Sequence, residues 1–508
     1  MDGKLTKTNL FVTSSRLYDF MQCPHKVWRD IYGPQEEKID EKNPFIELLW
    51  EKGVLHEKEI ISEVGAFVDL SEGTIEERID KTSAEMKKGT PLIYQGVLKF
   101  NNLLGIPDLL RMISPGKYLP IDIKSGKGFE GDDFDEEEGK PKKHYAVQLS
   151  LYVEILLNLS FADEKKGAIV DVSGKELTYL LENPQGVRNA QTWWELYLDI
   201  KNSIVELLSN TIQDRPAISG TCKLCPWYNS CKKWCLEKED LTKIFYLGRN
   251  LRDVLSKDLG IEKVSELRKL DIPDILAKKK KDKTFLKGFG ETLLKKFINR
   301  AAILDEIKKP ILHQQIQFPE VKNELFFDIE DDPTQDFVYL HGIYCRNQKG
   351  ESFVYFLAKE NSRDSEKVAW KEFWNFINTL PSGDFAVYYY ANHEKTTYKR
   401  LNQRYPDVIE NEKREAFFAN PNVIDLYQII QKNTDWPLSN YSLKDIATYL
   451  GFKWRDETPS GALSILWYND FIQNRSQELL KRILEYNEDD CKATMVLKDE
   501  IVKLSKNI

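Results

Sequence analysis

Residues 118–124 are the stretch that most constrains the fold of this chain. Apolar side chains alternate there with Asp122 and Lys124, which is the period-two pattern of a half-buried β-strand. Asp122 and Lys124 are therefore expected on the same face. A carboxylate can hold a hard divalent cation, while a lysine orients water or stabilises charge on a phosphate. The pair predicts metal-dependent phosphodiester cleavage, although most isolated Asp-x-Lys pairs are surface ion pairs.

The composition is that of a soluble globular protein. The chain has 508 residues, of which 41% are hydrophobic and 30% charged, and this length is enough for roughly two to four domains. A net charge of −8 argues against a uniformly basic nucleic-acid coat but leaves room for a local basic groove. Because no apolar run reaches the roughly 18 residues of a membrane span and no signal peptide is evident, we expect a cytoplasmic protein with no membrane partner.

Two further segments can complete a site around Asp122. Residues 93–111 are typical of a hairpin in which Asp108 stands at the mouth of an apolar strand, so adjacent strands can bring Asp108 beside Asp122. Paired carboxylates repel unless a cation lies between them. The amphipathic helix that starts near Tyr145 puts Gln148 and Tyr152 on one face. Those two side chains could hold a phosphate or the lysine, or could be ordinary interface residues.

The cysteines suggest a metal rather than disulfides. Four of the seven fall between residues 222 and 235, and such crowding is typical of metal sites. Cys23 lies far away, just before Pro24 at the end of a predicted helix. Its position alone indicates a buried apolar residue.

These pieces together resemble the RecB-like nucleases of the PD-(D/E)XK superfamily over about residues 10–235. His56, which alone would be interpreted as a surface helix residue, comes first, followed by Gly105-Ile-Pro-Asp108, Asp122-Ile-Lys124 and Gln148-x-x-x-Tyr152. The resemblance implies a restriction-endonuclease-like core with Mg²⁺ or Mn²⁺. Its functional residues would be the metal ligands His56, Asp108 and Asp122, the catalytic Lys124, and the supporting residues Gln148 and Tyr152.

The C-x2-C-x5-C spacing, with Cys23 as a distant partner, is similar to the iron–sulfur members of that group. This resemblance implies that a 4Fe-4S cluster is held by Cys23, Cys222, Cys225 and Cys231. Cys235 would then be spare. The alternative is a structural Zn²⁺ held by Cys222, Cys225, Cys231 and Cys235, which needs no distant residue.

Residues 239–315 form a helical segment between the two larger regions. The stretch 286–297 contains a Gly-x-Gly turn and resembles a helix-hairpin-helix. Such a turn offers backbone N–H groups to a DNA phosphate at a helix N-terminus. We therefore expect nucleic-acid contacts at Lys287, Gly288 and Gly290; the alternative is a helical spacer with solvated lysines.

The last segment opens with a strand that carries Asp328 and Glu330 on one face. Two further strands follow at 337–344 and 352–357, which suggests a ribonuclease H-like mixed sheet. An Asp-x-Glu pair on a first strand suits two-metal phosphodiester chemistry. The alternative is a pair of solvated carboxylates at a strand end.

The C-terminal half resembles the DEDD exonucleases that have a Tyr-x-x-x-Asp motif. Tyr486 and Asp490 are four residues apart on one helix. The resemblance implies that Asp328, Glu330 and Asp490 bind metal and that Tyr486 aligns water. The chain departs from the pattern at the second aspartate, where it has Asn392-His-Glu394; either Glu394 or Asp425 would supply that carboxylate.

Both halves occur together in a family of predicted bacterial and archaeal RecB-like nucleases, which this chain resembles over nearly its whole length. The expected protein is α/β and multidomain, with a nuclease at 1–238, a linker at 239–315 and an exonuclease at 316–508. It would cleave DNA ends in repair, recombination or defence, with 3′ to 5′ action at the second site. The alternatives are a C-terminal binding module or an RNA-trimming exonuclease. Without a Gly-x4-Gly-Lys-Ser/Thr loop, unwinding would need a helicase or repair partner.

Overall fold

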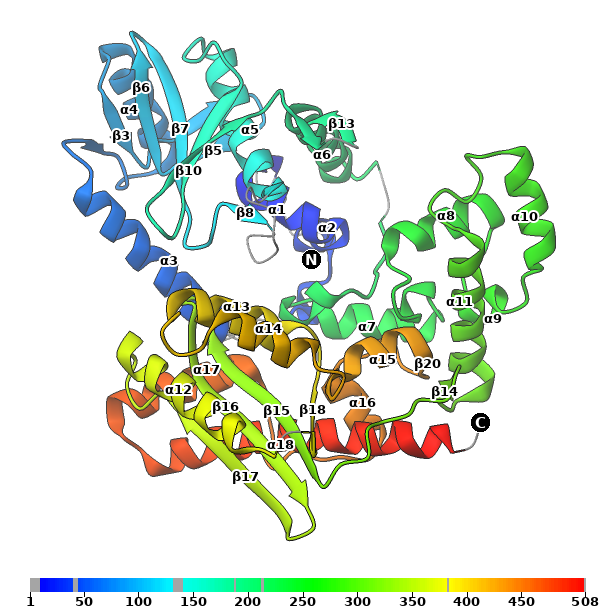
Figure 1. Ribbon diagram of the computed structural model, residues 1–508. Coiled ribbons are helices and arrows are strands. Elements are labelled where there is room, and N and C mark those ends of the chain that lie inside the picture. The colour runs from blue at the N-terminus through cyan, green and yellow to red at the C-terminus, as the bar shows by residue number, and fades with distance from the viewer. Residues whose placement is uncertain are drawn as a thin grey trace. The chain divides into compact units, whose positions relative to one another are not determined.

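The computed structural model describes residues 10–39, 44–130, 140–186, 189–211, 214–381 and 383–506. These residues form two units, each with its own core: unit 1 is Met1–Pro216 with Gly220–Lys232, and unit 2 is Ala217–Ser219 with Lys233–Ile508. Both units mix helices with sheets (Figure 1). Within the described ranges, none of the helices combines the length and apolarity that a membrane span requires.

Unit 1 is built on a six-stranded sheet with the order β11-β10-β7-β6-β3-β2. Strand β7 pairs antiparallel with β6 and parallel with β10. The strands of this sheet are β2 (Val68–Asp69), β3 (Leu92–Tyr94), β6 (Leu109–Ser114), β7 (Lys117–Ile123), β10 (Lys166–Val170) and β11 (Glu176–Leu180).

Strand β7 is buried on both faces, not on one as its alternating pattern predicts. Leu119, Ile121 and Ile123 pack in a cluster that includes residues of helix α3 (Pro44–Glu63). The other face carries Asp122 and is covered by helix α5 (Lys143–Asn158). The polar alternation therefore marks a buried site and not a solvent-facing side.

The expected hairpin at 93–111 is divided between two sheets. Strands β3 and β6 pair in the large sheet, whereas β4 (Leu98–Phe100) and β5 (Leu103–Gly105) join β1 (Val12–Thr13) in a separate three-stranded sheet. Gln95 follows β3 with a φ of 55°, which turns the chain out of the first sheet. Pro107 lies between β5 and β6 and has no N–H for a ladder.

The remaining helices of unit 1 surround these sheets. Helix α1 (Ser14–Gln22) is capped by the Thr13 side chain, which accepts from the Arg16 N–H. Pro24 starts the next helix at its first position, where a missing N–H costs nothing. The other elements are α2 (Pro24–Tyr32), α4 (Ile75–Lys88), α6 (Trp193–Leu208), and the short pairs β8 (Phe129–Glu130) with β9 (Lys140–Pro141) and β12 (Pro184–Gly186) with β13 (Asn189–Thr192). Helix α7 (Tyr228–Glu237) crosses from unit 1 into unit 2.

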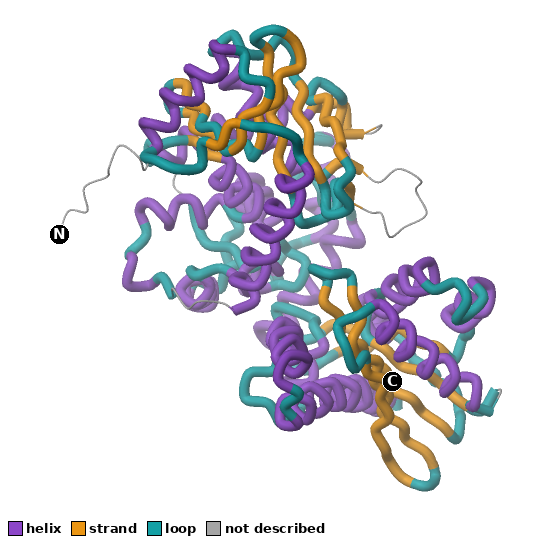
Figure 2. The backbone as a smooth tube through the Cα atoms, turned by 90° about the vertical axis from the view of Figure 1, so that its left-hand side faces the viewer, coloured by secondary structure: helices purple, strands orange, loops and turns teal. Residues whose placement is uncertain are grey.

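Unit 2 contains a five-stranded sheet with the order β17-β16-β15-β18-β19. Strands β17, β16 and β15 are antiparallel neighbours, and β15, β18 and β19 are parallel neighbours. Figure 2 shows helices packed along this sheet. Its strands are β15 (Asn323–Asp332), β16 (Phe337–Asn347), β17 (Gly350–Leu357), β18 (Phe385–Tyr389) and β19 (Val423–Asp425).

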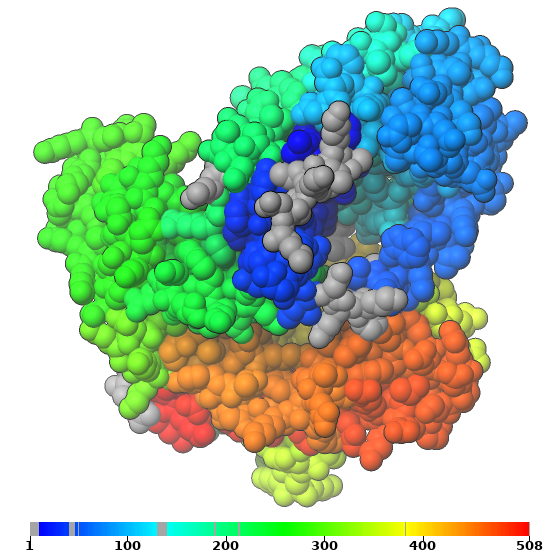
Figure 3. Space-filling model, turned by 180° about the vertical axis from the view of Figure 1, so that it is seen from behind, coloured from blue at the N-terminus to red at the C-terminus, as the bar shows by residue number. Residues whose placement is uncertain are grey.

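The two faces of this sheet have separate aromatic-rich cores. Leu325, Phe327 and Ile329 of β15 pack with helices α12 (Arg363–Thr379), α13 (His393–Arg404) and α14 (Asn411–Ala419). Phe326 points to the opposite face, which is covered by α15 (Leu426–Asn433), α16 (Leu443–Tyr449) and α18 (Gln477–Ser505). Strand periodicity therefore places Asp328 and Glu330 on the α18 face. In the space-filling view, the C-terminal part of unit 2 forms a continuous orange-to-red surface (Figure 3).

The helical segment of residues 239–315 belongs to unit 2 and has a core of its own. Arg300 is almost fully buried, pairs with Asp435 at 2.6 Å and donates to the Phe245 carbonyl at 2.7 Å. The contact with Asp435 joins the segment to the rest of unit 2. The elements of the segment are α8 (Arg249–Leu259), α9 (Val264–Leu267), α10 (Ile272–Lys281), α11 (Glu291–Ala302) and β14 (Ile311–Leu312). Strand β14 pairs with β20 (Thr434–Asp435), which lies outside the segment. Further along the chain, α17 (Gly461–Asn474) precedes α18.

Candidate active sites

In unit 1, the carboxyl end of β7 carries the first group of candidate residues. Lys124 Nζ lies 2.8 Å from Asp122 Oδ2, so the two side chains share a face as the alternation predicts. The Asp122 side chain is buried, whereas Lys124 retains some exposure. The pair is therefore a partly shielded ion pair and not a surface one.

Asp108 lies beside this pair because β6 and β7 are antiparallel neighbours. Its Oδ2 accepts from the backbone N–H of Ile123 at 2.7 Å, and its Oδ1 accepts from Gln95 Nε2 at 3.0 Å. Burial and the neighbouring charge of Asp122 raise the pKa of Asp108 to about 8, against the opposing effect of Lys124. A divalent cation bound between the two close carboxylates would favour the ionised form of Asp108.

Helix α5 adds Tyr152 and Gln148 to these surroundings. A Cβ atom on Gly105 would lie 2.5 Å from Tyr152 Cδ1, so only glycine allows the ring to pack against β5. The Tyr152 hydroxyl donates to the Ile106 carbonyl at 3.5 Å, and burial and the charge of Asp122 raise its pKa well above the ordinary value. One turn earlier, Gln148 Oε1 is buried and has no hydrogen-bond partner within the described ranges. It is an acceptor that a bound water or ligand could use.

His56 belongs to α3. Its Nε2 is 3.2 Å from the carbonyl oxygen of Asp171, which directly follows β10 beside β7. The next residue, Glu57, was not selected from the sequence. Its Oε1 accepts from Gln95 Nε2 at 2.8 Å, and its charge adds to the raised pKa of Asp108. A lone glutamate on a charged helix carries no sequence signal for such a role.

Four cysteines of unit 1 influence one another electrostatically. Burial raises the pKa of Cys225 to about 11, and the neighbouring thiols of Cys23, Cys231 and Cys222 add to the increase. Buried Arg29 donates to Cys231 Sγ at 3.8 Å. Cys23 thus lies near the three later cysteines despite its distance along the chain.

Cys235 has a different environment. It belongs to unit 2, is fully buried, and its sulfur accepts from the Thr242 hydroxyl at 4.0 Å. In addition to burial, the pKa values of Cys225 and Cys231 are raised by other thiols of unit 1, namely those of Cys23 and Cys222 in both cases. The surroundings of Cys235 therefore differ from those of the four cysteines of unit 1.

In unit 2, Asp328, Glu330 and Asp490 converge. One carboxylate oxygen from each lies within 4.8 Å of the others, and within the described part of the chain this is the one group of metal-ligating side chains with that geometry. Burial and the charge of Asp490 raise the pKa of Glu330 to about 8, and the same causes raise that of Asp328. A buried set of converging carboxylates fits hard divalent cations such as Mg²⁺ or Mn²⁺.

The structure distinguishes the two candidates for a fourth carboxylate. Glu394 lies in the first turn of α13, is 3% exposed, and its Oε2 has no hydrogen-bond partner among the residues described. Its charge also contributes to the raised pKa of Asp328. Asp425 instead caps α15, and its Oδ1 accepts from the N–H groups of Ala391 and Tyr427. Glu394 is therefore the better placed of the two, and Asp425 holds the turn that leads into α13.

Tyr486 lies between Asp490 and a lysine that sequence reasoning did not select. Its hydroxyl accepts from Lys444 Nζ at 2.7 Å and hydrogen-bonds to Asp490. Trp454 Nε1 donates to Asp490 Oδ1 at 2.7 Å and was not selected either. No spacing rule links Lys444 or Trp454 to the carboxylates, because packing of separate elements creates these contacts.

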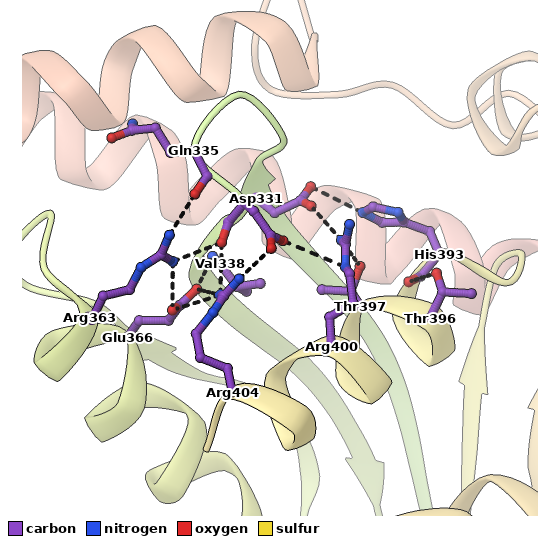
Figure 4. Close-up of polar contacts among 11 residues, drawn as sticks. Asp331, Gln335, Val338, Arg363, Glu366, His393, Thr396, Thr397, Arg400 and Arg404 are labelled. Atoms are coloured by element: carbon purple, nitrogen blue, oxygen red, sulfur yellow. Dashed lines mark hydrogen bonds and ion pairs between the residues drawn. The ribbon is translucent and has the colours of Figure 1, made fainter. Parts of the chain in front are cut away.

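A polar network joins the end of β15 to α13 (Figure 4). Asp331 accepts from His393 Nε2 at 3.1 Å and pairs with Arg400 at 3.8 Å. On the same helix, Arg404 pairs with the fully buried Glu366 at 3.1 Å. The network fixes the helix that carries Glu394 against the strand that carries Asp328.

The predicted nucleic-acid loop is exposed and internally braced. Lys287, Gly288 and Gly290 are exposed, and Gly288 has a φ of 91° that favours glycine. Asp258 accepts from the Leu286 N–H at 2.7 Å, and Gly290 caps α11. The geometry leaves the turn open to solvent, although Glu291 puts a negative charge in the first turn of the helix.

Two family models match the chain, and each matched region contains one of the two groups of candidate residues. Residues 19–232 match the PD-(D/E)XK nuclease superfamily, and residues 325–502 match the RNase_H superfamily. No curated protein matches the sequence. The chain therefore joins a PD-(D/E)XK nuclease superfamily domain to an RNase H superfamily domain, a combination of nuclease domains that implies nucleic-acid substrates.

Proposed function

We propose that the protein is a metal-dependent exonuclease with two catalytic sites that act on DNA ends. The observation that carries the proposal is the buried convergence of Asp328, Glu330 and Asp490 in a domain of a nuclease superfamily. An independent carboxylate–lysine group in the other nuclease domain supports a second site.

At the site of unit 2, Asp328, Glu330, Glu394 and Asp490 would hold the cations. Bound Mg²⁺ or Mn²⁺ would activate water and stabilise charge on the phosphate. The Tyr486 hydroxyl, which accepts from Lys444, would orient the attacking water. Family resemblance favours removal of nucleotides in the 3′ to 5′ direction.

At the site of unit 1, Asp108, Asp122 and His56 would bind the metal. Lys124 would stabilise charge on the phosphate, because its ammonium group stays beside Asp122 and is partly exposed. Gln148 and Tyr152 would position the lysine or the phosphate from α5. The unpartnered oxygen of Gln148 supports this role.

We further propose that Cys23, Cys222, Cys225 and Cys231 bind a 4Fe-4S cluster with a structural role. Besides burial, the thiols of Cys23 and Cys222 raise the pKa of both Cys225 and Cys231, so the distant Cys23 belongs with the three later cysteines of unit 1. The zinc alternative needs Cys235, which belongs to unit 2 and accepts from the Thr242 hydroxyl. These observations favour the cluster over zinc.

The cluster proposal has a direct chemical test. Protein purified without oxygen should be brown and contain iron and sulfide. Replacement of Cys231 by Ser should remove the colour, whereas replacement of Cys235 by Ser should keep it. Colourless protein with one zinc per chain would refute the cluster.

Exposed Lys287, Gly288 and Gly290 would contact the DNA backbone, and a helicase or repair protein would supply separated strands. The proposed pathway is repair, recombination or defence. Two other functions have an observation in their favour. Glu394 replaces the expected aspartate, which would suit a C-terminal binding module. The RNase_H superfamily match would also suit RNA trimming.

The test is cleavage of end-labelled single-stranded DNA and of matched RNA with Mn²⁺ or Mg²⁺. Wild type would be compared with Lys124→Ala, Asp328→Ala and the double variant. We expect each single variant to lose one product ladder and the double variant to lose both. If Lys124→Ala abolishes all cleavage while Asp328→Ala leaves cleavage unchanged, unit 2 is instead a binding module on these substrates.

A further inference from the structure

Asn487 lies within the carboxylate cluster of unit 2, between Tyr486 and Asp490 on α18. Its side chain is fully buried. The amide Nδ2 donates to Asp328 Oδ2 at 2.7 Å and to Glu330 Oε1 at 3.4 Å. The opposite orientation of the amide would set an oxygen against two carboxylates, so only this orientation satisfies both. One neutral side chain therefore bridges the two acidic residues of β15.

Gly342 provides the space for that amide. It is the register partner of Asp328 on β16. A Cβ atom at this position would lie 1.6 Å from Asn487 Oδ1 and 2.8 Å from Asn487 Cγ. In addition, Cys491 Sγ donates to the Gly342 carbonyl at 3.6 Å. Helix α18 thus packs directly on the backbone of β16, and any side chain at position 342 would push the amide away.

We propose that Asn487 is a positioning residue that holds Asp328 and Glu330 in the arrangement that binds a divalent cation, and that Gly342 makes this possible. The inference rests on the proposed function of the site in unit 2. A neutral amide suits the task because it fixes both carboxylates without cancelling their charge. It engages only Oδ2 of Asp328 and so leaves Oδ1 for a cation.

A purely structural role would look different. Asn487 could simply attach α18 to the sheet, and its loss would then lower stability without changing metal affinity. Cation affinity therefore distinguishes the two roles. Outer partners of metal ligands typically change affinity by about 10- to 100-fold when they are removed.

The experiment measures Mn²⁺ binding by the electron paramagnetic resonance signal of the free ion. The background is full-length Asp122→Asn, which disables the site of unit 1. In it, Asn487→Leu should weaken Mn²⁺ binding by about 10-fold or more. Ser505→Ala is the matched control, because Ser505 is also a buried polar residue of α18 and bonds the Ile316 backbone away from the site. It should lower thermal stability and leave Mn²⁺ affinity unchanged.

Gly342→Ala provides a second variant that keeps every ligand. It should weaken Mn²⁺ binding in the presence of Asn487 but have little further effect in an Asn487→Ala background, because the collision is removed. Such coupling is measured by a double-mutant cycle between the two positions. If Gly342→Ala weakens Mn²⁺ binding equally with Asn487 present and in the Asn487→Ala background, the proposed role of Gly342 is overturned.

Asp328→Asn in the same background separates this inference from the proposed function. If Asp328→Asn loses Mn²⁺ binding while Asn487→Leu retains wild-type affinity, only the positioning role is overturned. If Asp328→Asn and its parent bind Mn²⁺ equally, unit 2 has no cation site at these residues, and both proposals are refuted.

Discussion

In unit 1 a lysine stands beside the carboxylates, whereas in unit 2 the converging carboxylates are approached by neutral donors. Lys124 pairs directly with Asp122, while Asp328 and Glu330 receive the Asn487 amide. Lys444 of unit 2 donates to the Tyr486 hydroxyl and not to a carboxylate of the site. The comparison teaches that a cation contacts a carboxylate directly in unit 1, while in unit 2 the direct donors are neutral and the charge of Lys444 acts from beyond the Tyr486 hydroxyl.

The largest expected effect is that loss of a carboxylate changes the free energy of unfolding in opposite directions at the two sites. Asp328→Asn removes one of several repelling carboxylates and should stabilise metal-free protein by about 1 kcal/mol or more. Asp122→Asn leaves Lys124 without its partner and should destabilise unit 1 by about 1–3 kcal/mol, below the value for fully buried pairs because Lys124 is partly exposed. Both should reduce cleavage at their own site by more than about 100-fold.

Urea unfolding in the presence of a chelator, followed separately for the two units by hydrogen exchange, would measure these stabilities. If Asp328→Asn and Asp122→Asn both lower the free energy of unfolding, the proposed electrostatic difference between the two sites is wrong. Excess Mn²⁺ should stabilise wild-type unit 2 and have no such effect on the Asp328→Asn variant.

A smaller effect is expected at Lys444. Lys444→Met should reduce cleavage by the site of unit 2 by about 10- to 100-fold through kcat, because the Tyr486 hydroxyl loses its donor. Lys444→Arg should restore part of the activity. The matched control is Lys481→Met, which removes an exposed lysine of α18 that pairs with Glu485 at 3.8 Å, and it should leave cleavage unchanged. A change in KM alone would assign Lys444 to substrate binding.

A separate effect concerns acid stability and involves a residue other than the carboxylates. Burial lowers the pKa of His341 to about 3, from an ordinary value of 6.5. Because the folded state resists protonation, the stabilising effect of neutral His341 is complete above pH 6.5 and is lost as pH falls toward 3. At pH 5 the loss is about 2 kcal/mol.

His341→Phe should flatten the pH dependence of unit 2 between about pH 6.5 and 5, despite losing the 2.7 Å bond to the Tyr398 hydroxyl. Thermal unfolding at these pH values measures the slope. An unchanged slope would show that groups other than His341, such as the buried carboxylates, govern the pH dependence of stability.

Sequence patterns predicted the site residues that share one strand or one helix. Alternation is enough to place Asp122 with Lys124, and Asp328 with Glu330, because strand side chains repeat every second residue. It did not show that β7 is covered on both faces, because burial of its polar face depends on α5. It also could not choose between Glu394 and Asp425, since both lie at or beyond the end of an apolar strand.

The residues that sequence reasoning missed act across separate elements. Lys444, Trp454 and Asn487 meet the site through the packing of α16, a loop and α18. Asn487 sits inside the Tyr-x-x-x-Asp spacing, where it looks like a spacer. Its hydrogen bonds to Asp328 and Glu330, and the space that Gly342 leaves for its amide, are visible only in the structure.

The placement of Asp490 on α18 also sets when the site of unit 2 can form during synthesis. Asp328 and Glu330 leave the ribosome about 160 residues earlier, which at roughly 5–20 residues per second is about 8–32 seconds. During that interval the strand carboxylates have neither their third partner nor the Asn487 amide. A growing chain therefore lacks this proposed cleavage centre while it is still close to its own messenger RNA.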